Sequence, residues 1–127
     1  MGIIDRSTID EARSTGILYL SHRSLAAIPG EVFTLTNLVR LDLGWNNLKE
    51  ISPRIGELAK LEELWLNQNP LTSLPVELES CVKLKILDLR STQLRRLPNE
   101  IGRLNYLHEI DLRDTLLKHK QMGGLAD

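Results

Sequence analysis

The chain has 127 residues, with 16 lysines and arginines against 17 aspartates and glutamates, and 42% of its residues are hydrophobic. A chain of this size can bury a core of its own, and its near-zero net charge excludes a general attraction to nucleic acid or to an acidic membrane surface. No stretch approaches the roughly 20 apolar residues of a membrane span. Cys81 has no second cysteine with which to form an internal disulfide, so we expect one domain in a reducing compartment, the cytoplasm.

Residues 1–14 precede the regular part of the chain and carry helix signals. Ser7 in the segment DRSTIDEAR is a candidate N-cap, and the residues STG at 14–16 are a stop signal. The sequence therefore predicts a short helix that turns Ile9 and Ala12 inward and covers the unit that follows it.

A period of 23 residues runs through residues 15–117. Three full units begin at Leu38, Leu61 and Leu84, and they read LVRLDLGWNNLKEISPRIGELAK, LEELWLNQNPLTSLPVELESCVK and LKILDLRSTQLRRLPNEIGRLNY. A degenerate copy begins at Thr15, and a partial copy begins at Leu107. A fixed period of this length indicates a solenoid of stacked rungs, because one rung cannot bury the edges of its own core.

Each rung combines a short strand with a longer return path. In the segment LDL the residues alternate, so that Leu41 and Leu43 face the core and Asp42 faces outward. Apolar residues then recur at spacings of three and four, which suits a loop with a loose helical turn. The predicted fold is an α/β solenoid whose short strands stack in parallel at about 4.8 Å.

Asparagine occupies the ninth position of two rungs, at Asn46 and Asn69, where the strand turns into the loop. There an amide can satisfy backbone groups left unpaired by the bend, and stacked amides can bond to one another. Arg23, Thr92 and Thr115 take the same position in the other rungs. We expect those rungs to be held more weakly.

The period and the rung pattern resemble those of the leucine-rich repeat family. The endings LPNEIGRL (97–104) and ISPRIGEL (51–58) are similar to those of its intracellular Ras-suppressor-like branch, which includes the plant Ras-group proteins. The resemblance implies a capping helix at 1–14, about four full repeats and a partial fifth at 15–117, and a tail or truncated cap at 118–127. It also implies a non-enzymatic scaffold that has its strands on a concave face, its loops and helical turns on a convex side, and a protein partner on the concave face.

The outward residues of a stack in register form rows on the strand face. Tyr19, Trp45 and Trp65 all fall there, and we interpret them as an aromatic anchor for a partner, with Gly44 leaving room for one of its side chains. Trp65 could instead only shield its neighbours in the sheet. The predicted partner-binding residues are Tyr19, Arg40, Asp42, Trp45, Trp65, Asn67, Asp88, Arg90, Glu109, Asp111 and Arg113.

A catalytic alternative rests on Asp88 and Asp111, since carboxylates on adjacent strands would lie about 5 Å apart, as in retaining glycosidases. Arg90 and Arg113 are near enough to neutralise both, so we favour charge pairing and predict no enzyme. The histidines and Cys81 lack the spacing of metal ligands, and we predict no metal and no cofactor.

Two further features leave alternatives open. Lys49, Arg95, Arg96 and Lys118, with His119 and Lys120 beside them, would form a basic rim that either docks an acidic or phosphorylated segment or is a solvated edge. The last rung would expose Leu112, Leu116 and Leu117, so the alternative function is a structural subunit that self-associates there.

Overall fold

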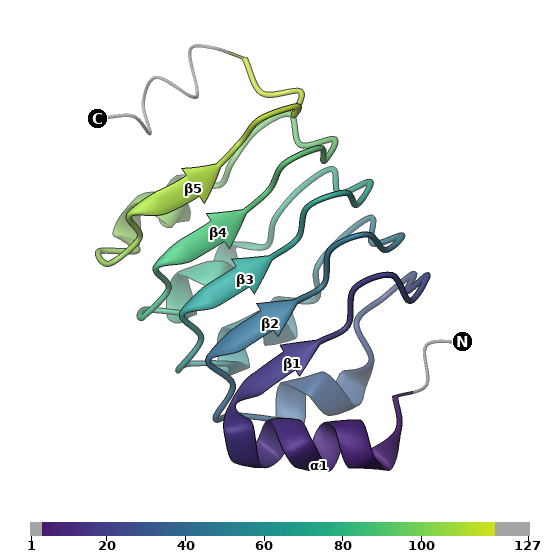
Figure 1. Cartoon of the computed structure of the whole chain (residues 1–127). Coiled ribbons are helices and arrows are strands. Elements are labelled where there is room, and N and C mark those ends of the chain that lie inside the picture. Colours follow the sequence, from purple (N-terminus) through teal and green to yellow (C-terminus); the bar gives the residue numbers. More distant parts are fainter. Residues whose placement is uncertain (1–3, 119–127) are drawn as a thin grey trace.

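The computed structural model describes residues 4–118 as a stack of five rungs with one helix covering the end of the stack next to the first strand (Figure 1). The helix α1 spans Arg6–Thr15. The strands are β1 (Ile17–Tyr19), β2 (Arg40–Asp42), β3 (Glu63–Trp65), β4 (Ile86–Asp88) and β5 (Glu109–Asp111). Each of the first four is followed by a 3₁₀ helix, and these are η1 (Gly30–Thr34), η2 (Pro53–Glu57), η3 (Val76–Ser80) and η4 (Asn99–Arg103).

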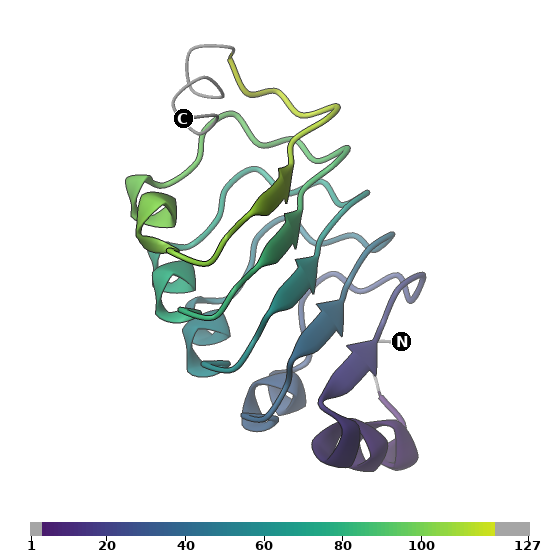
Figure 2. The same ribbon diagram turned by 60° about the vertical axis from the view of Figure 1, so that its left-hand side comes forward.

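The five strands form one parallel sheet in the order β1-β2-β3-β4-β5. The 3₁₀ helices lie in a second layer behind the sheet, one on each return path (Figure 2). The pairing is in step throughout, because Tyr19 lies opposite Asp42, Asp42 opposite Trp65, and Trp65 opposite Asp88. Equal positions of successive rungs are therefore lateral neighbours, as in the predicted leucine-rich repeat solenoid.

The core fills the space between the strands and the 3₁₀ helices. The central strand residues Leu18, Leu41, Leu64 and Leu87 are all buried, and the row two residues later, which includes Leu43, is buried too. Ile55 of η2 closes the core from the other layer. The residues between the buried ones point outward, which is the alternation that the sequence predicts for a strand.

Asn46 and Asn69 join adjacent rungs. The Oδ1 atom of Asn46 accepts from the backbone N–H of Leu25 at 3.0 Å, and its Nδ2 donates to the carbonyl of Leu20 at 3.0 Å. Asn69 in turn donates to the carbonyl of Leu43 at 3.0 Å. Our expectation that stacked amides bond to one another is wrong for these two, since backbone groups of the preceding rung and of their own rung take up their hydrogen-bonding groups.

The helix α1 begins earlier than predicted. Asp5, not Ser7, precedes its first turn, and the backbone carbonyl of Asp5 already accepts from the N–H of Ile9 at 3.1 Å. The helix ends as expected at Gly16, whose φ of 77° lies in the left-handed region that favours glycine. Ile9 and Ala12 are buried against the first rung, as the sequence predicts.

Candidate functional site

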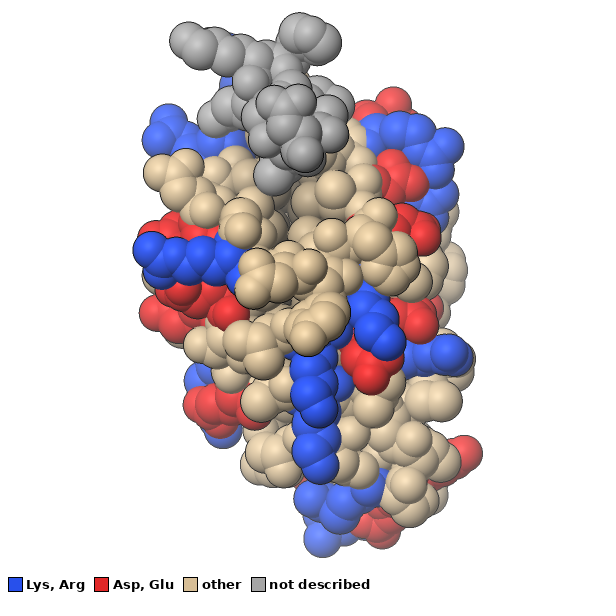
Figure 3. All heavy atoms as spheres, turned by 90° about the vertical axis from the view of Figure 1, so that its left-hand side faces the viewer, with Lys and Arg blue, Asp and Glu red and all other residues tan. Residues whose placement is uncertain are grey.

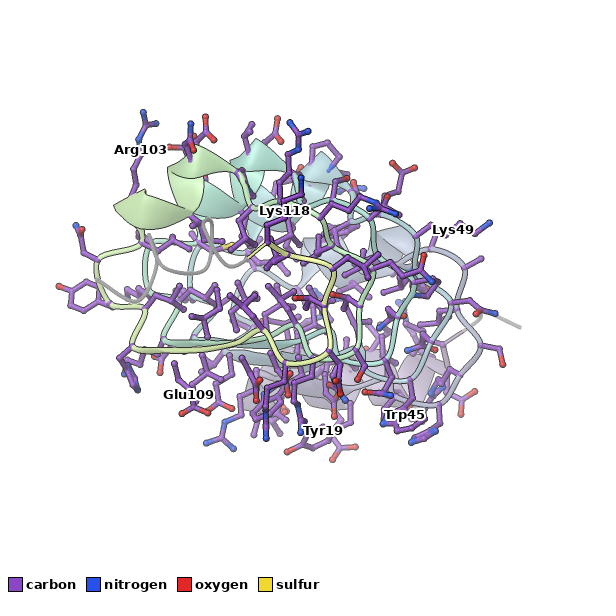
Figure 4. All side chains as sticks on the ribbon, turned by 90° about the horizontal axis from the view of Figure 1, so that it is seen from above. Tyr19, Trp45, Lys49, Arg103, Glu109 and Lys118 are labelled. Carbon is purple, nitrogen blue, oxygen red and sulfur yellow. The ribbon has the colours of Figure 1, made fainter. Side chains whose placement is uncertain are left out.

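The outward side chains of the strands and of the turn that follows them form one surface, which we call the strand face. Seen along the stack, Tyr19, Trp45 and Glu109 all project on this side, whereas Arg103 lies on the opposite side with the 3₁₀ helices (Figure 4). The structure thus places residues from the first, second and fifth rungs on a common surface.

Trp65 lies at the centre of the strand face and outside the core. Its strand neighbours Leu64 and Leu66 are buried, while the indole is half-buried and its Nε1 donates to Glu63 Oε1 at 3.2 Å. Tyr19, two strands away, is 61% exposed. The sheet alternation therefore turns Trp65 outward, and Glu63 restrains its orientation.

Three shallow hollows follow one another along this face, separated by the rings of Tyr19 and Trp65. The aromatic hollow, of about 260 Å³, is lined by Tyr19, Arg40, Asp42, Glu63 and Trp65. The charged hollow, of about 180 Å³, is lined by Trp65, Ile86, Leu87, Asp88, Arg90, Glu109, Asp111 and Arg113. The third hollow, of about 260 Å³, lies beside α1 and is lined by Thr8, Glu11, Thr15, Ile17, Leu18 and Tyr19.

Trp45 is not part of the aromatic hollow. It is 53% exposed in the turn after β2, and its ring stacks on His22 with a centroid separation of 5.3 Å and an angle of 14°. The expected single anchor of three aromatic residues is therefore divided into the pair Tyr19 and Trp65 and a separate His22–Trp45 stack. Sequence reasoning missed His22 as a partner, although it holds the same rung position as Trp45.

Trp45 also has an unusual backbone conformation. Each rung leaves its strand through a residue with φ between 56° and 59°, and these residues are His22, Trp45, Gln68, Ser91 and Asp114. A bulky side chain in this left-handed region costs about 1–2 kcal/mol. The fold imposes this conformation on every rung, so tryptophan at position 45 lowers the stability of the folded chain through backbone strain.

The charged residues of the later rungs pair with one another. Arg90 donates to both carboxylate oxygens of Asp88, and its Nη2 lies 2.7 Å from Oδ2. Its Nε also lies 3.6 Å from Oδ2 of Asp111. Arg113 contacts Asp111 in the same way at 2.6 Å. The hydrogen bond from Arg113 lowers the pKa of Asp111, and the hydrogen bond to Asp88 raises the pKa of Arg90. Two adjacent Asp–Arg pairs thus present a fixed pattern of charge.

The second rung has no such pair. Asp42 Oδ1 accepts from the N–H of Gly44 at 2.9 Å, and Arg40 pairs with Glu63 at 3.0 Å. The room expected beside Gly44 is absent, because a Cβ built there would lie 2.8 Å from Oδ1 of Asn67. Asn67 fills that space, since equal rung positions are lateral neighbours. Glu63, which the sequence-based prediction omitted, belongs to this group and shares an outward row with Arg40.

The remaining predicted features lie elsewhere or differ from expectation. Lys49, Arg95, Arg96 and Lys118 are all exposed, and Figure 4 shows Lys49 and Lys118 away from the strand face. His119 and Lys120 lie outside the described residues. Acidic and basic side chains intermingle on the side of the stack where the strands begin (Figure 3). Leu112 is buried and Leu117 half-buried, so only Leu116 of the three expected leucines is exposed.

Residues 4–118 show neither a metal-ion site nor a helix that could cross a membrane, and Cys81 is a buried thiol. Residues 4–118 contain no group of three or more histidine, cysteine, aspartate or glutamate side chains arranged to hold a metal ion. Within the same range, no helix is both long and apolar enough to cross a membrane. Burial raises the pKa of the Cys81 thiol to about 11, and its Sγ donates to the carbonyl of Ile55.

Comparisons with known proteins agree with this architecture. A leucine-rich repeat model matches residues 13–71, and a second, described as two copies of the repeat, matches residues 59–101. No curated protein shows a significant match. Among solved structures, a leucine-rich repeat protein of Leptospira interrogans is similar, with 30% sequence identity and a TM-score of 0.61 over 85% of this chain and 34% of that chain. This chain therefore spans about a third of that protein, and the matched models and the fold together show that it contains leucine-rich repeats and has the leucine-rich repeat fold.

Proposed function

We propose that the chain is a non-enzymatic scaffold that binds a protein partner on its strand face. One observation carries the proposal. Tyr19 and Trp65 each line two neighbouring hollows, and both lie on a surface outside the core. Tryptophan and tyrosine most often dominate the binding energy of protein interfaces. Leucine-rich repeat domains in general mediate protein–protein interaction, which agrees with this role.

Trp65 is suited to act as an anchor because its side chain is already restrained before a partner binds. The hydrogen bond to Glu63 and the flanking strands hold the indole, so that less rotamer freedom is lost when a partner docks. A partner side chain in the aromatic hollow would contact Tyr19 and Trp65, and a second contact would be made by the exposed His22–Trp45 stack.

The later rungs would select the partner rather than supply most of the affinity. The Asp88–Arg90 and Asp111–Arg113 pairs fix alternating charges beside the charged hollow, together with the exposed Glu109. A partner with mismatched charges would have to desolvate these groups without pairing them, which is unfavourable.

The test is capture of partners from a lysate followed by affinity measurement on the proteins retained. Trp65→Ala and Tyr19→Ala should each weaken binding by about 2 kcal/mol and leave the urea midpoint of unfolding close to that of the wild type. Tyr106→Ala is the matched control, because Tyr106 is 65% exposed and lies in the turn between η4 and β5, outside the hollows. Binding that survives both substitutions would show that the anchor is assigned to the wrong residues.

The setting of this scaffold is also a proposal. The LPNEIGRL and ISPRIGEL endings and the unpaired Cys81 support an intracellular, cytoplasmic leucine-rich repeat protein of the Ras-suppressor-like kind. Its organisation would be a capping helix at 1–14, repeats at 15–117 and a tail at 118–127. A fluorescent fusion imaged in cells tests the compartment.

Self-association remains the second candidate, and Leu116 is the residue that favours it. It is 48% exposed on the last described rung, next to the half-buried Leu117. Sedimentation over a range of concentrations would detect a dimer, and Leu116→Glu should abolish it. A monomer at all concentrations would contradict this function.

A further inference from the structure

Three aspartates share the central outward row of the sheet, and they differ in whether a cation pairs with them. Asp88 and Asp111 are each followed two residues later by an arginine, which contacts them at 2.7 and 2.6 Å. Asp42 is followed at that position by Gly44, and among residues 4–118 its carboxylate accepts a hydrogen bond only from the glycine N–H. Within residues 4–118, Asp42 takes part in no ion pair.

Position 44 cannot supply the missing cation. Gly44 is buried, and the side chain of Asn67 occupies the space into which a side chain at position 44 would project. The second rung has the sequence LDLG where later rungs have LDLR and IDLR. Asp42 therefore lacks the arginine that pairs with the other two aspartates of the row.

Aromatic residues flank this carboxylate on both sides. The register places Asp42 opposite Tyr19 on one neighbouring strand and opposite Trp65 on the other. Strands about 4.8 Å apart set the two ring-bearing residues about 10 Å from each other, with the carboxylate between them. All three line the aromatic hollow, and tyrosine and tryptophan rings attract cations as well as apolar groups.

The other two residues of the hollow leave it with an excess of negative charge. Arg40 Nε lies 3.0 Å from Glu63 Oε2, so this arginine is already paired, and Glu63 also accepts from Trp65. One arginine against two carboxylates gives the hollow a charge of about −1 at neutral pH. The rows at the third, fifth and seventh rung positions are acidic as well, because they hold three arginines, Arg40, Arg90 and Arg113, and five carboxylates, Asp42, Glu63, Asp88, Glu109 and Asp111.

We propose that the aromatic hollow receives a basic side chain of the partner, an arginine or a lysine, whose charge pairs with Asp42 between Tyr19 and Trp65. The inference rests on the proposed function and adds to it the chemistry of the partner, which is an extended basic segment. The carboxylate accepts the N–H donors of the guanidinium or ammonium, and the rings pack against the aliphatic stem.

The test uses the full chain and two-dimensional NMR with synthetic peptides as probes. Nine-residue peptides alternate glycine with arginine, with lysine, or with uncharged norleucine. We expect the Trp65 indole N–H and the Gly44 amide, which is bonded to Asp42, to shift saturably with the arginine and lysine peptides and not with the norleucine peptide. A Trp45→Phe sample assigns the two indole signals. The two basic peptides show which cation the hollow prefers.

Asp42→Asn should weaken the binding of the basic peptides at least 10-fold, whereas Asp42→Glu, which keeps the charge, should retain part of it. Glu50→Gln is the matched control, since it removes the same charge from an exposed residue outside the hollow and should change the affinity less than about 2-fold. Unshifted core amides establish that each variant is folded. Equal affinities of the Asp42→Asn and Glu50→Gln variants, or no saturable shift at millimolar peptide, would overturn the inference.

Partner capture separates this inference from the proposed function. A partner lost by Trp65→Ala but retained at full affinity by Asp42→Asn would leave the scaffold function standing and remove the cation site. A partner retained by Trp65→Ala and Tyr19→Ala would remove the strand face as the binding surface.

Discussion

The side chain of Asn46 donates a hydrogen bond to the carbonyl oxygen of Leu20, 3.0 Å away in the preceding rung. The same amide accepts from the N–H of Leu25 in that rung, so one side chain satisfies both a donor and an acceptor across the boundary. Thr92, at the equivalent position two rungs later, donates only to Leu89 of its own rung. The boundaries between rungs therefore differ in how they are hydrogen-bonded.

Replacing Asn46 with alanine should lower the free energy of unfolding by about 3 kcal/mol, because buried backbone groups of two rungs lose their partners together. Thr92→Ala should cost about 1 kcal/mol, since a single carbonyl is affected. Urea unfolding followed by circular dichroism measures both. Similar losses in the two variants would show that the asparagine does not couple the rungs.

Two glycines at the same rung position should respond differently to alanine. A Cβ on Gly56 would lie 2.8 Å from the backbone carbonyl of Glu77, whereas one on Gly102 meets nothing within 4 Å in the described structure. We expect Gly56→Ala to cost about 1–3 kcal/mol by forcing η2 and η3 apart. Gly102→Ala should be neutral or stabilise by about 0.5 kcal/mol. Thermal unfolding of both variants checks the contrast, and equal effects would contradict the close approach of the rungs.

Trp45→Asn should cost little stability although it removes a tryptophan. Asparagine relieves about 1 kcal/mol of strain at the φ of 56°, which offsets the loss of the stack on His22, worth about 0.5–1 kcal/mol. Ser91→Asn is the control, because it has the same backbone conformation and no ring to lose, and it should be neutral or slightly stabilising. A loss above about 2 kcal/mol in Trp45→Asn would place this side chain among the structural residues.

The Asp111–Arg113 pair should contribute to stability only above acid pH. The pKa of Asp111 in the folded protein lies below its unfolded value of about 3.9, so the unfolded state takes up the proton first as the pH falls. The stabilisation is present above about pH 4 and is lost as the pH falls through the folded pKa. Arg113→Gln should therefore be less stable than the wild type at neutral pH, and the difference should disappear in acid. Urea unfolding at low ionic strength across this range measures it, with Arg96→Gln as the control.

Cys81 should react with thiol reagents only when the protein unfolds. The side chain is fully buried, and burial raises its pKa to about 11, so that little thiolate exists in the native state at neutral pH. Labelling should follow global unfolding and accelerate in urea together with the loss of circular dichroism. Fast labelling in buffer would mean that the rung around Cys81 opens locally.

Local pattern was sufficient to predict the strands, the buried leucines and the outward direction of Trp65. These follow from the alternation of a strand and from repetition every 23 residues, both of which are readable in one dimension. The start of α1 was predicted less well, because the sequence analysis took Ser7 as the N-cap, whereas the helix follows Asp5, whose side chain makes no capping hydrogen bond.

Repetition every 23 residues is enough to predict that copies of one short unit stack in register, and so which residues share the strand face. How those residues pair is visible only in the folded stack: Trp45 stacks on His22, Asn67 occupies the space beside Gly44, and Arg40 pairs with Glu63, while Asp42 forms no ion pair within residues 4–118. A repeat period fixes the positions of Cα atoms, whereas side-chain pairing depends on rotamers and on neighbours that belong to adjacent rungs.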